Sequence, residues 1–117
     1  MHNNQEIGRI GENLAAKYLQ KSGYMIIDRN FRCKQGEIDI IAKYGKEFVF
    51  VEVKTRTNLN YGKPAEAVTQ IKQKHIEKAT QYYIYIKNLF NAFIRLDIIE
   101  VYIKSNEYRI NHIKQIV

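Results

Sequence analysis

The sequence has little cysteine, one proline and no tryptophan. Its one cysteine, Cys33, cannot form an intrachain disulfide, so a reducing cytoplasm is the compartment to expect. There is no apolar run of the roughly eighteen residues that would span a bilayer. The opening "MHNNQEIGRIGE" also lacks the basic start and apolar stretch of a signal peptide. These absences argue against a membrane partner.

Acidic residues are also scarce relative to basic ones. The chain has 19 Lys and Arg against 12 Asp and Glu, a net charge of +7. This excess favours polyanionic partners, although charge alone fits a generic basic protein equally well. One cysteine and histidines at positions 2, 75 and 112 offer no zinc-ligand spacing, so any metal would be held mainly by carboxylates. At 117 residues, we expect a single domain covering residues 1–117.

Hydrophobic periodicity predicts two helices and five strands. The helices are expected from Gln5 to about Ser22 and from about Ala65 to Ile86. The strands are expected at Tyr24–Arg32, Glu37–Tyr44, Lys46–Thr55, Arg95–Ile103 and Glu107–Ile113. The order α-β-β-β-α-β-β predicts an α/β (α+β) fold with a central mixed sheet flanked by helices.

The stretch "FVFVEVKTR" places charges inside an apolar strand. Side chains alternate along a strand, so Glu52 and Lys54 share a face with Phe48 and Phe50, while the valines share the other. Both faces are apolar at first, which is typical of a central strand. A charge at the end of such a strand is costly unless it is paired or bound to an ion.

The preceding strand, "GEIDIIAKY", also carries acids. Alternation predicts one face with Ile38, Ile40 and Ala42 and another with Glu37, Asp39 and Ile41. If the two strands form a hairpin around Gly45, Asp39 and Glu52 become near neighbours across the ladder. Glu37 is then either a further ligand or an exposed strand residue, and the second reading is favoured.

The first helix contributes another acid. At about 100° per residue, Glu12 falls just past the edge of the apolar arc, beside Leu19. Gly8, Gly11 and Ala15 make this side of the helix small, which would allow close approach to the sheet. Glu12 could therefore reach the same cluster.

Such a cluster suits a hard cation. Mg²⁺ and Mn²⁺ prefer oxygen ligands, which Asp39, Glu52 and the backbone carbonyl of Val53 could supply. Lys54 could orient a water molecule or stabilise transition-state charge on a phosphodiester. The alternative is structural: Glu52 and Lys54 form an ion pair at a strand end, and Asp39 is a solvated acid near a turn.

These residues resemble a known pattern. A helix Glu, an Asp after "GE", and Glu-x-Lys ending an apolar strand resemble the PD-(D/E)XK nuclease superfamily, which has a restriction-endonuclease-like, three-layer core. The segments "GRIGENLAAKYL", "NFRCKQGEIDIIA", "FVFVEVKTR" and "RLDIIEV" look like the bacterial YraN-like family of endonucleases, which is similar to archaeal Holliday-junction resolvases. The superfamily's "PD" is Ile38-Asp39 here.

The resemblance implies a Mg²⁺- or Mn²⁺-dependent endonuclease acting on DNA, including branched DNA. Its roles fall on Glu12 as the helix acid, Asp39 and Glu52 as metal ligands, and Lys54 as the catalytic amine. Under the resolvase likeness a symmetric homodimer is expected.

Three basic residues are candidates for nucleic-acid binding. Arg56 and Lys63 flank the predicted site and either contact phosphates or are ordinary solvated charges. Lys72 projects into an apolar helix arc, where it either snorkels or points at a phosphate. Asp97 and Arg95 share a strand face and are expected to pair with each other.

Two other functions stay open. One is a non-catalytic nucleic-acid-binding module that retains the nuclease fold, and the other is a structural interaction protein. Salt-sensitive binding without turnover would favour the first. Negligible affinity for polynucleotide would favour the second.

Overall fold

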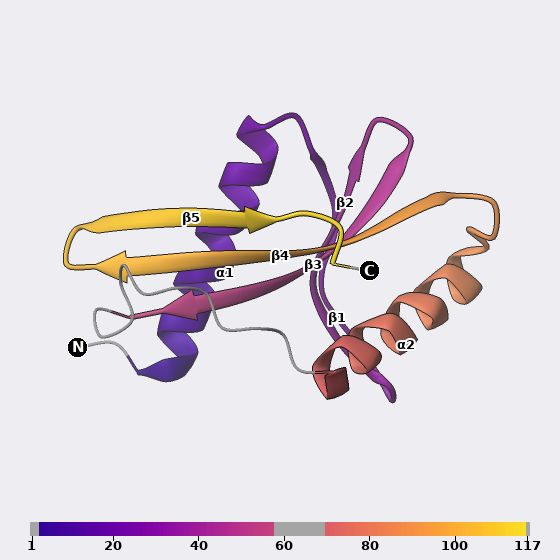
Figure 1. Cartoon of the computed structure of the whole chain (residues 1–117), viewed down its shortest axis with the longest axis horizontal. Helices are drawn as coiled ribbons and strands as arrows, with labels where there is room; N and C mark the ends of the chain where they lie inside the picture. Colours follow the sequence, from indigo (N-terminus) through magenta and orange to yellow (C-terminus); the bar gives the residue numbers. More distant parts are fainter. Residues whose placement is uncertain (1–2, 58–69, 117) are drawn as a thin grey trace.

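The structure is a computed structural model that describes residues 3–57 and 70–116. The elements are α1 (Asn4–Lys21), β1 (Met25–Cys33), β2 (Gly36–Tyr44), β3 (Glu47–Arg56), α2 (Gln70–Lys87), β4 (Phe93–Lys104) and β5 (Glu107–Ile113) (Figure 1). Their order is the α-β-β-β-α-β-β predicted from the sequence. The start predicted for the second helix, at Ala65, and the loop around Pro64 lie outside the described residues.

The five strands form one sheet in the order β1-β2-β3-β4-β5. β3 and β4 run parallel, whereas every other neighbouring pair is antiparallel. The sheet is therefore mixed, as predicted. Its parallel pair is joined by the connection that contains α2, because parallel strands need a long crossover.

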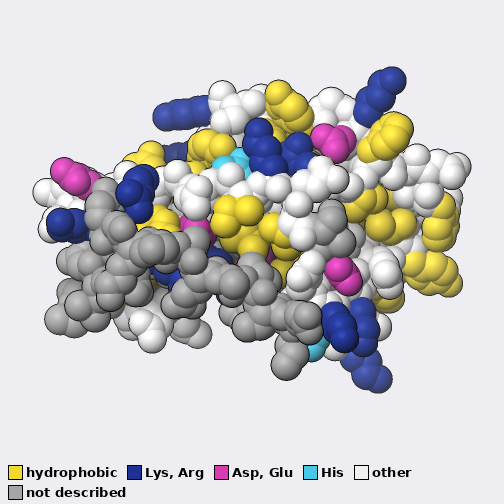
Figure 2. Space-filling view, in the orientation of Figure 1, with side chains coloured by type: hydrophobic (Ala, Val, Ile, Leu, Met, Phe, Trp, Pro, Cys, Tyr) yellow, Lys and Arg dark blue, Asp and Glu magenta, His cyan; other side chains and the backbone are white. Residues whose placement is uncertain are grey.

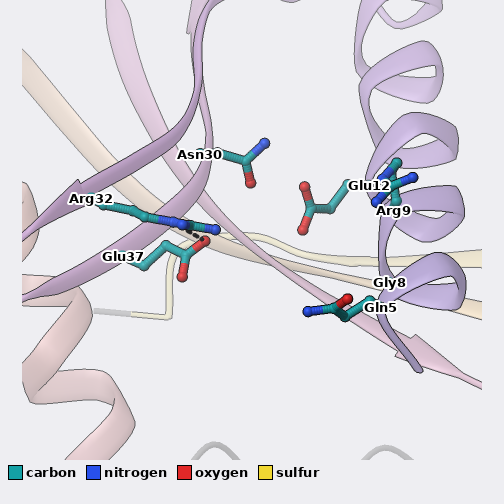
Figure 3. A pocket seen from close by; sticks show the side chains of 7 residues that line it. All are labelled: Gln5, Gly8, Arg9, Glu12, Asn30, Arg32 and Glu37. Carbon is teal, nitrogen blue, oxygen red and sulfur yellow. Dashed lines mark ion pairs between the residues drawn. The ribbon is translucent and has the colours of Figure 1, made fainter. Parts of the chain in front are cut away.

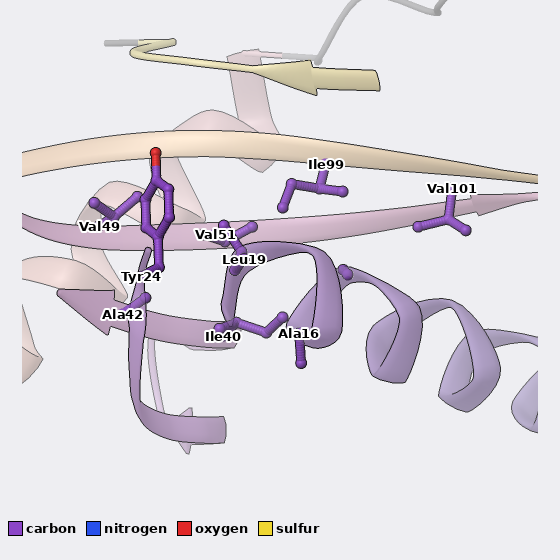
Figure 4. Packing of buried hydrophobic residues seen from close by; sticks show 10 residues of the cluster. Ala16, Leu19, Tyr24, Ile40, Ala42, Val49, Val51, Ile99 and Val101 are labelled. Atoms are coloured by element: carbon purple, nitrogen blue, oxygen red, sulfur yellow. The ribbon is translucent and has the colours of Figure 1, made fainter. Parts of the chain in front are cut away.

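The two helices cover opposite faces of the sheet. Leu19 and Ala16 of α1 pack with Ile40, Val51 and Ile99 in one buried cluster (Figure 4). On the other face the cluster consists of Ile38, Ile41, Phe50, Ile76, Ala79, Tyr83 and Leu96, three of which come from α2. This three-layer arrangement confirms the fold class predicted from the sequence.

Helix α1 is capped and packed as its sequence predicts. The Asn3 side chain accepts a hydrogen bond from the Glu6 N–H at 2.8 Å, and Gly23, with φ +94°, follows the helix end. A Cβ built on Gly11 would collide with the Thr55 side chain, so α1 approaches the sheet closely at Gly11. Gly8 was expected to do the same but does not: a Cβ there would meet nothing within 4 Å.

Strand β2 breaks its alternation at Asp39. Ile40 packs on the α1 side of the sheet, while Ile38 packs with Ile41 on the α2 side. The prediction that Ile38 and Ile40 share one face is therefore wrong. The paired residues of the β2–β3 ladder end at Ile40 and Val51, so β2 is no longer held in register with β3 beyond that point.

A buried polar network joins β4 to β5 and the C-terminal residues. Arg95 Nη2 lies 3.0 Å from Asp97 Oδ2, confirming the predicted pair. His112 Nε2 lies 2.7 Å from the same oxygen, and the Gln115 N–H donates to Asp97 Oδ1 at 2.9 Å. Burial raises the pKa of Asp97, but the hydrogen bonds from His112 and Arg95 outweigh burial and hold the pKa below its ordinary value.

Neither described helix has the length and apolar character needed to cross a bilayer. Exposed apolar side chains gather where α2 leads into β4, namely Tyr82, Tyr85, Ile86, Phe90 and Phe93 (Figure 2). The Lys and Arg side chains of the described residues are spread over the face shown there.

Candidate active site

The site begins where the β2–β3 ladder ends. The residues that follow the last pair, Ile40–Val51, are Asp39 on β2 and Glu52 on β3, and these two are not paired. Here a side-chain hydrogen bond replaces the main-chain pairing: Asp39 Oδ2 accepts a hydrogen bond from the Val53 N–H at 2.8 Å. The hairpin around Gly45 therefore brings Asp39 to Val53 of β3, next to Glu52, which is where the sequence predicts it.

The Val53 carbonyl shares this edge of β3. In a strand, the N–H and C=O of one residue point toward the same neighbouring strand. Because the Val53 N–H points at Asp39, its C=O also points to the β2 side of β3. The backbone oxygen proposed as a ligand is therefore turned toward Asp39.

Asp39 is a half-buried acid among other acids. The pKa of its carboxyl is raised from 3.8 to about 7. Desolvation by burial is the main cause, the negative charges of Glu12, Glu37 and Glu52 add to it, and the hydrogen bond from the Val53 N–H acts in the opposite direction. Three other acidic side chains thus lie within electrostatic reach of Asp39. Such a cluster favours a bound proton or a cation.

Glu52 and Lys54 contact each other. Lys54 Nζ lies 3.5 Å from Glu52 Oε1, and both side chains are about one fifth exposed, at 18% and 21%. The other carboxylate oxygen, Glu52 Oε2, is buried and has no hydrogen-bond partner among the described residues. The ion pair that the structural alternative predicts is therefore present, but it leaves one buried oxygen unsatisfied.

Glu12 enters the site from α1. Its carboxylate projects from the helix toward the β1–β2 strands (Figure 3) and lies 4.0 Å from Arg29 Nη2. Desolvation by burial raises the pKa of Glu12, and the negative charge of Glu37 adds to that, while Arg29 lowers it. Glu12 also raises the pKa of Asp39, so the helix acid acts on the predicted cluster.

The described residues do not form a ready-made all-protein metal cage. Within residues 3–57 and 70–116, no group of three or more His, Cys, Asp or Glu side chains is positioned to hold a metal ion. The available donors at the strand end are the Asp39 and Glu52 carboxylates and the Val53 carbonyl. These oxygens suit Mg²⁺ or Mn²⁺, which commonly keep water and phosphate oxygens as their remaining ligands.

Arg56 has an internal partner. Its guanidinium lies 3.6 Å from Glu100 Oε2, and the Asn111 amide donates to Glu100 Oε1 at 2.8 Å. In the β3–β4 ladder, Lys54 stands opposite Glu100. Phosphate contact by Arg56 stays a prediction, Lys63 lies outside the described residues, and so does the Lys72 side chain.

Sequence reasoning missed some residues around the site. Asn30 and Arg32 of β1 line a cavity together with Glu12, and the buried Glu100 neutralises Arg56. The signal for Glu100 was available: once Asp97 is paired with Arg95, the second acid of the apolar run "RLDIIEV" needs a partner of its own. No comparable signal marked Asn30, because its left-handed backbone, with φ +53°, is a feature of the folded strand.

The fold and the strand-end acids define an α/β protein with a carboxylate-rich site where one hairpin opens. Residues 11–101 match the model of a family described as "Uncharacterised protein family UPF0102". The chain belongs to this family. The likeness to the YraN-like family that the motifs indicated is thereby confirmed.

Relatives match over nearly the whole chain. UPF0102 proteins from Caldicellulosiruptor saccharolyticus and Caldanaerobacter subterraneus are 47% and 49% identical, covering 96% and 95% of this chain and 97% and 93% of their own lengths. One from Clostridium botulinum strain Loch Maree is 50% identical, over 95% of this chain and 93% of its own.

Two solved structures show weaker likeness. Pyrococcus furiosus SfsA in complex with Ca²⁺ has a TM-score of 0.42 at 16% identity, covering 96% of this chain and 64% of its own. SSO0001 has a TM-score of 0.39 at 18% identity, and the match covers 99% of this chain and 54% of the SSO0001 chain.

Proposed function

We propose that the protein is a Mg²⁺- or Mn²⁺-dependent endonuclease that hydrolyses phosphodiester bonds in DNA, including branched or otherwise structured DNA. The observation that carries this proposal is the Asp39 carboxylate at the open end of the β2–β3 ladder. Its pKa is raised first by burial and then by crowding with the acids Glu12, Glu37 and Glu52. A divalent cation would relieve that crowding.

The residues present fit such a cation. Asp39 and Glu52 would hold it together with the Val53 carbonyl, and the unsatisfied Glu52 Oε2 is an oxygen that a cation would satisfy. When bound, the metal supplies Lewis-acid chemistry: it lowers the pKa of water and neutralises charge on a phosphodiester.

The chain's own groups have distinct roles in this proposal. Lys54, held at 3.5 Å by Glu52, carries an ammonium that orients the attacking water or donates hydrogen bonds to phosphate oxygens as negative charge develops. Glu12 adds a further acid from α1. The net charge of +7 draws the polyanionic substrate to the protein.

The proposal is tested by cleavage of labelled DNA. Duplex, flap and four-way-junction substrates are incubated with Mg²⁺ or Mn²⁺ and either the wild type or Asp39→Asn. We expect the substitution to slow cleavage by at least about a hundredfold, because it removes a metal ligand. Asp28→Asn is the matched control, since Asp28 also accepts a backbone N–H, that of Arg29, at 2.9 Å. Equal cleavage by wild type and Asp39→Asn would contradict the proposal.

A second candidate function is a non-catalytic nucleic-acid-binding module. The observation that favours it is that no three potential ligand side chains converge among the described residues. This function predicts salt-sensitive binding of DNA by wild type, without turnover at any divalent-metal concentration. Any metal-dependent cleavage that is lost in Asp39→Asn rules it out.

A further inference from the structure

A cavity of about 400 Å³ adjoins the acidic cluster. One wall is α1, with Gln5, Gly8, Arg9 and Glu12 (Figure 3). The opposite wall belongs to β1 and β2, with Asn30, Arg32 and Glu37. Glu37 lines this cavity and lies two residues from Asp39 on β2, so a nucleic-acid strand placed at the cluster would pass beside the opening.

The charges of the cavity cancel. Arg9 and Arg32 are balanced by Glu12 and Glu37, although the whole chain carries +7. Arg32 and Glu37 also face each other, with Nε and Oε1 3.5 Å apart. A phosphate group would be better served by unopposed cations. A neutral group suits this lining better.

The polar groups offer both donors and acceptors. Gln5 and Asn30 carry amides, which can donate and accept hydrogen bonds at the same time. Arg32 adds a planar guanidinium, and its side chain is 76% exposed, so it is available for stacking. A nucleobase has matching chemistry: a neutral, flat ring with donors and acceptors along its edges.

The shape of the cavity depends on Gly8. This residue lies within α1, yet a Cβ on it would meet nothing within 4 Å. No side chain therefore projects from this position of the helix into the cavity. The volume lies within the range of about 300–1,000 Å³ that is usual for small-molecule sites.

We propose that this cavity receives an unpaired nucleobase of the bound nucleic acid. The inference rests on the proposed function and narrows its substrate class to DNA with an unstacked nucleotide next to the cleaved bond, as occurs at bulges, flaps and junctions. The flipped base lies between α1 and the β1–β2 strands, and the phosphate beside it reaches the Asp39 cluster.

The test compares two DNA duplexes by fluorescence anisotropy in EDTA. One carries a single unpaired adenine, and the other carries an abasic residue at the same bulge. We expect wild type to bind the adenine bulge about tenfold more tightly, in keeping with the usual effect of stacking one base. Gly8→Leu fills the cavity and should bring the ratio of the two affinities close to one.

Gln20→Leu is the matched control, because it adds the same side chain to an exposed position on the same helix, away from the cavity. It should keep the wild-type ratio. If circular dichroism shows that Gly8→Leu is not folded, Arg32→Ala takes its place and should lower the ratio. A wild-type ratio near one, or a tenfold ratio that survives in the folded cavity variant, overturns the inference.

Cleavage of the same duplexes in Mg²⁺ or Mn²⁺ separates this inference from the proposed function. Base-dependent binding without any cleavage would leave the cavity assignment standing and remove the endonuclease. Cleavage that ignores the unpaired base would do the opposite.

Discussion

The Asp39 carboxylate accepts the backbone N–H of Val53 at 2.8 Å, just beyond Ile40 and Val51, the last paired residues of the β2–β3 ladder. A side chain thus extends a main-chain ladder. The contact fixes an ionisable group where the β2–β3 pairing ends, so the charge state of that group affects both the fold and the site.

The first prediction concerns pH. Because the folded-state pKa of Asp39 is raised from 3.8 to about 7, the folded protein binds more protons than the unfolded chain between those values. The resulting stability is complete below the ordinary pKa and is lost as pH rises through the folded pKa. Each pKa unit is worth about 1.4 kcal/mol, and halving the sum for partial exposure leaves a loss of roughly 2 kcal/mol.

Urea unfolding of wild type and Asp39→Asn across that pH range measures this loss. The difference in free energy of unfolding, wild type minus variant, should fall as pH rises, because the amide does not titrate. Asp28→Asn serves as the control. A difference that is flat with pH would show that Asp39 titrates normally.

The second prediction concerns divalent metal. A cation that binds the folded protein alone raises the Tm, by at least about 5 °C when its concentration is a hundred times the Kd. The rise should be larger above the pKa of Asp39 than below it, since the ligand must lose its proton. Differential scanning fluorimetry with Mg²⁺ and Mn²⁺ measures the shift.

Glu52→Gln should abolish most of that rise, because it removes one carboxylate charge while keeping the side-chain shape. Glu77→Gln, on α2, is the control for general charge effects. Equal rises in Tm for wild type and Glu52→Gln would place any metal elsewhere.

The third prediction concerns two glycines of the same helix. Gly11→Ala should lower the free energy of unfolding by about 1–3 kcal/mol, because its Cβ would collide with Thr55. Gly8→Ala should raise it by about 0.5–1 kcal/mol, since helix propensity improves and nothing is in contact.

Urea denaturation of both variants measures these opposite changes in the free energy of unfolding. Adding Thr55→Ala to Gly11→Ala should recover part of the loss, because it removes the nearest contact atom. If both alanines stabilise the protein equally, α1 does not approach β3 as closely as the structure places it.

The fourth prediction concerns Arg56. Its guanidinium is 17% exposed beside Glu100, whose side chain is 2% exposed. Arg56→Met should lower the free energy of unfolding by about 3 kcal/mol, because it leaves the buried Glu100 carboxylate without the positive charge of Arg56. Adding Glu100→Gln should restore part of the loss, and Lys17→Met on exposed α1 surface is the control. An Arg56→Met variant of normal stability that binds DNA weakly would instead support the phosphate contact predicted from the sequence.

Much of the fold could be predicted because local patterns determine it. Alternation and the short connection at Gly45 were enough to bring Asp39 to Val53, the residue that follows Glu52. Helical spacing placed Glu12 at the edge of the buried face of α1. The pairing of Arg95 with Asp97 followed from their shared strand face and is confirmed.

The remaining features depend on contacts between distant segments. The parallel register that sets Lys54 opposite Glu100 follows from the crossover and cannot be deduced from either strand alone. The rotation of Ile38 away from Ile40 arises where pairing with β3 stops. Gly8 and Gly11 are the same residue type on one helix, and only the position of Thr55 distinguishes their roles.

The antiparallel run from β1 to β3 also bears on how the site assembles. Glu12, Asp39, Glu52 and Lys54 all precede the crossover to β4, and short turns alone connect β1 to β2 and β2 to β3. The entropic cost of closing the loop is low for such local pairings, whereas the parallel β3–β4 pair must close a long loop. Formation of the hairpins should thus bring the strand-borne acids together early in folding, before β4 docks and completes the sheet.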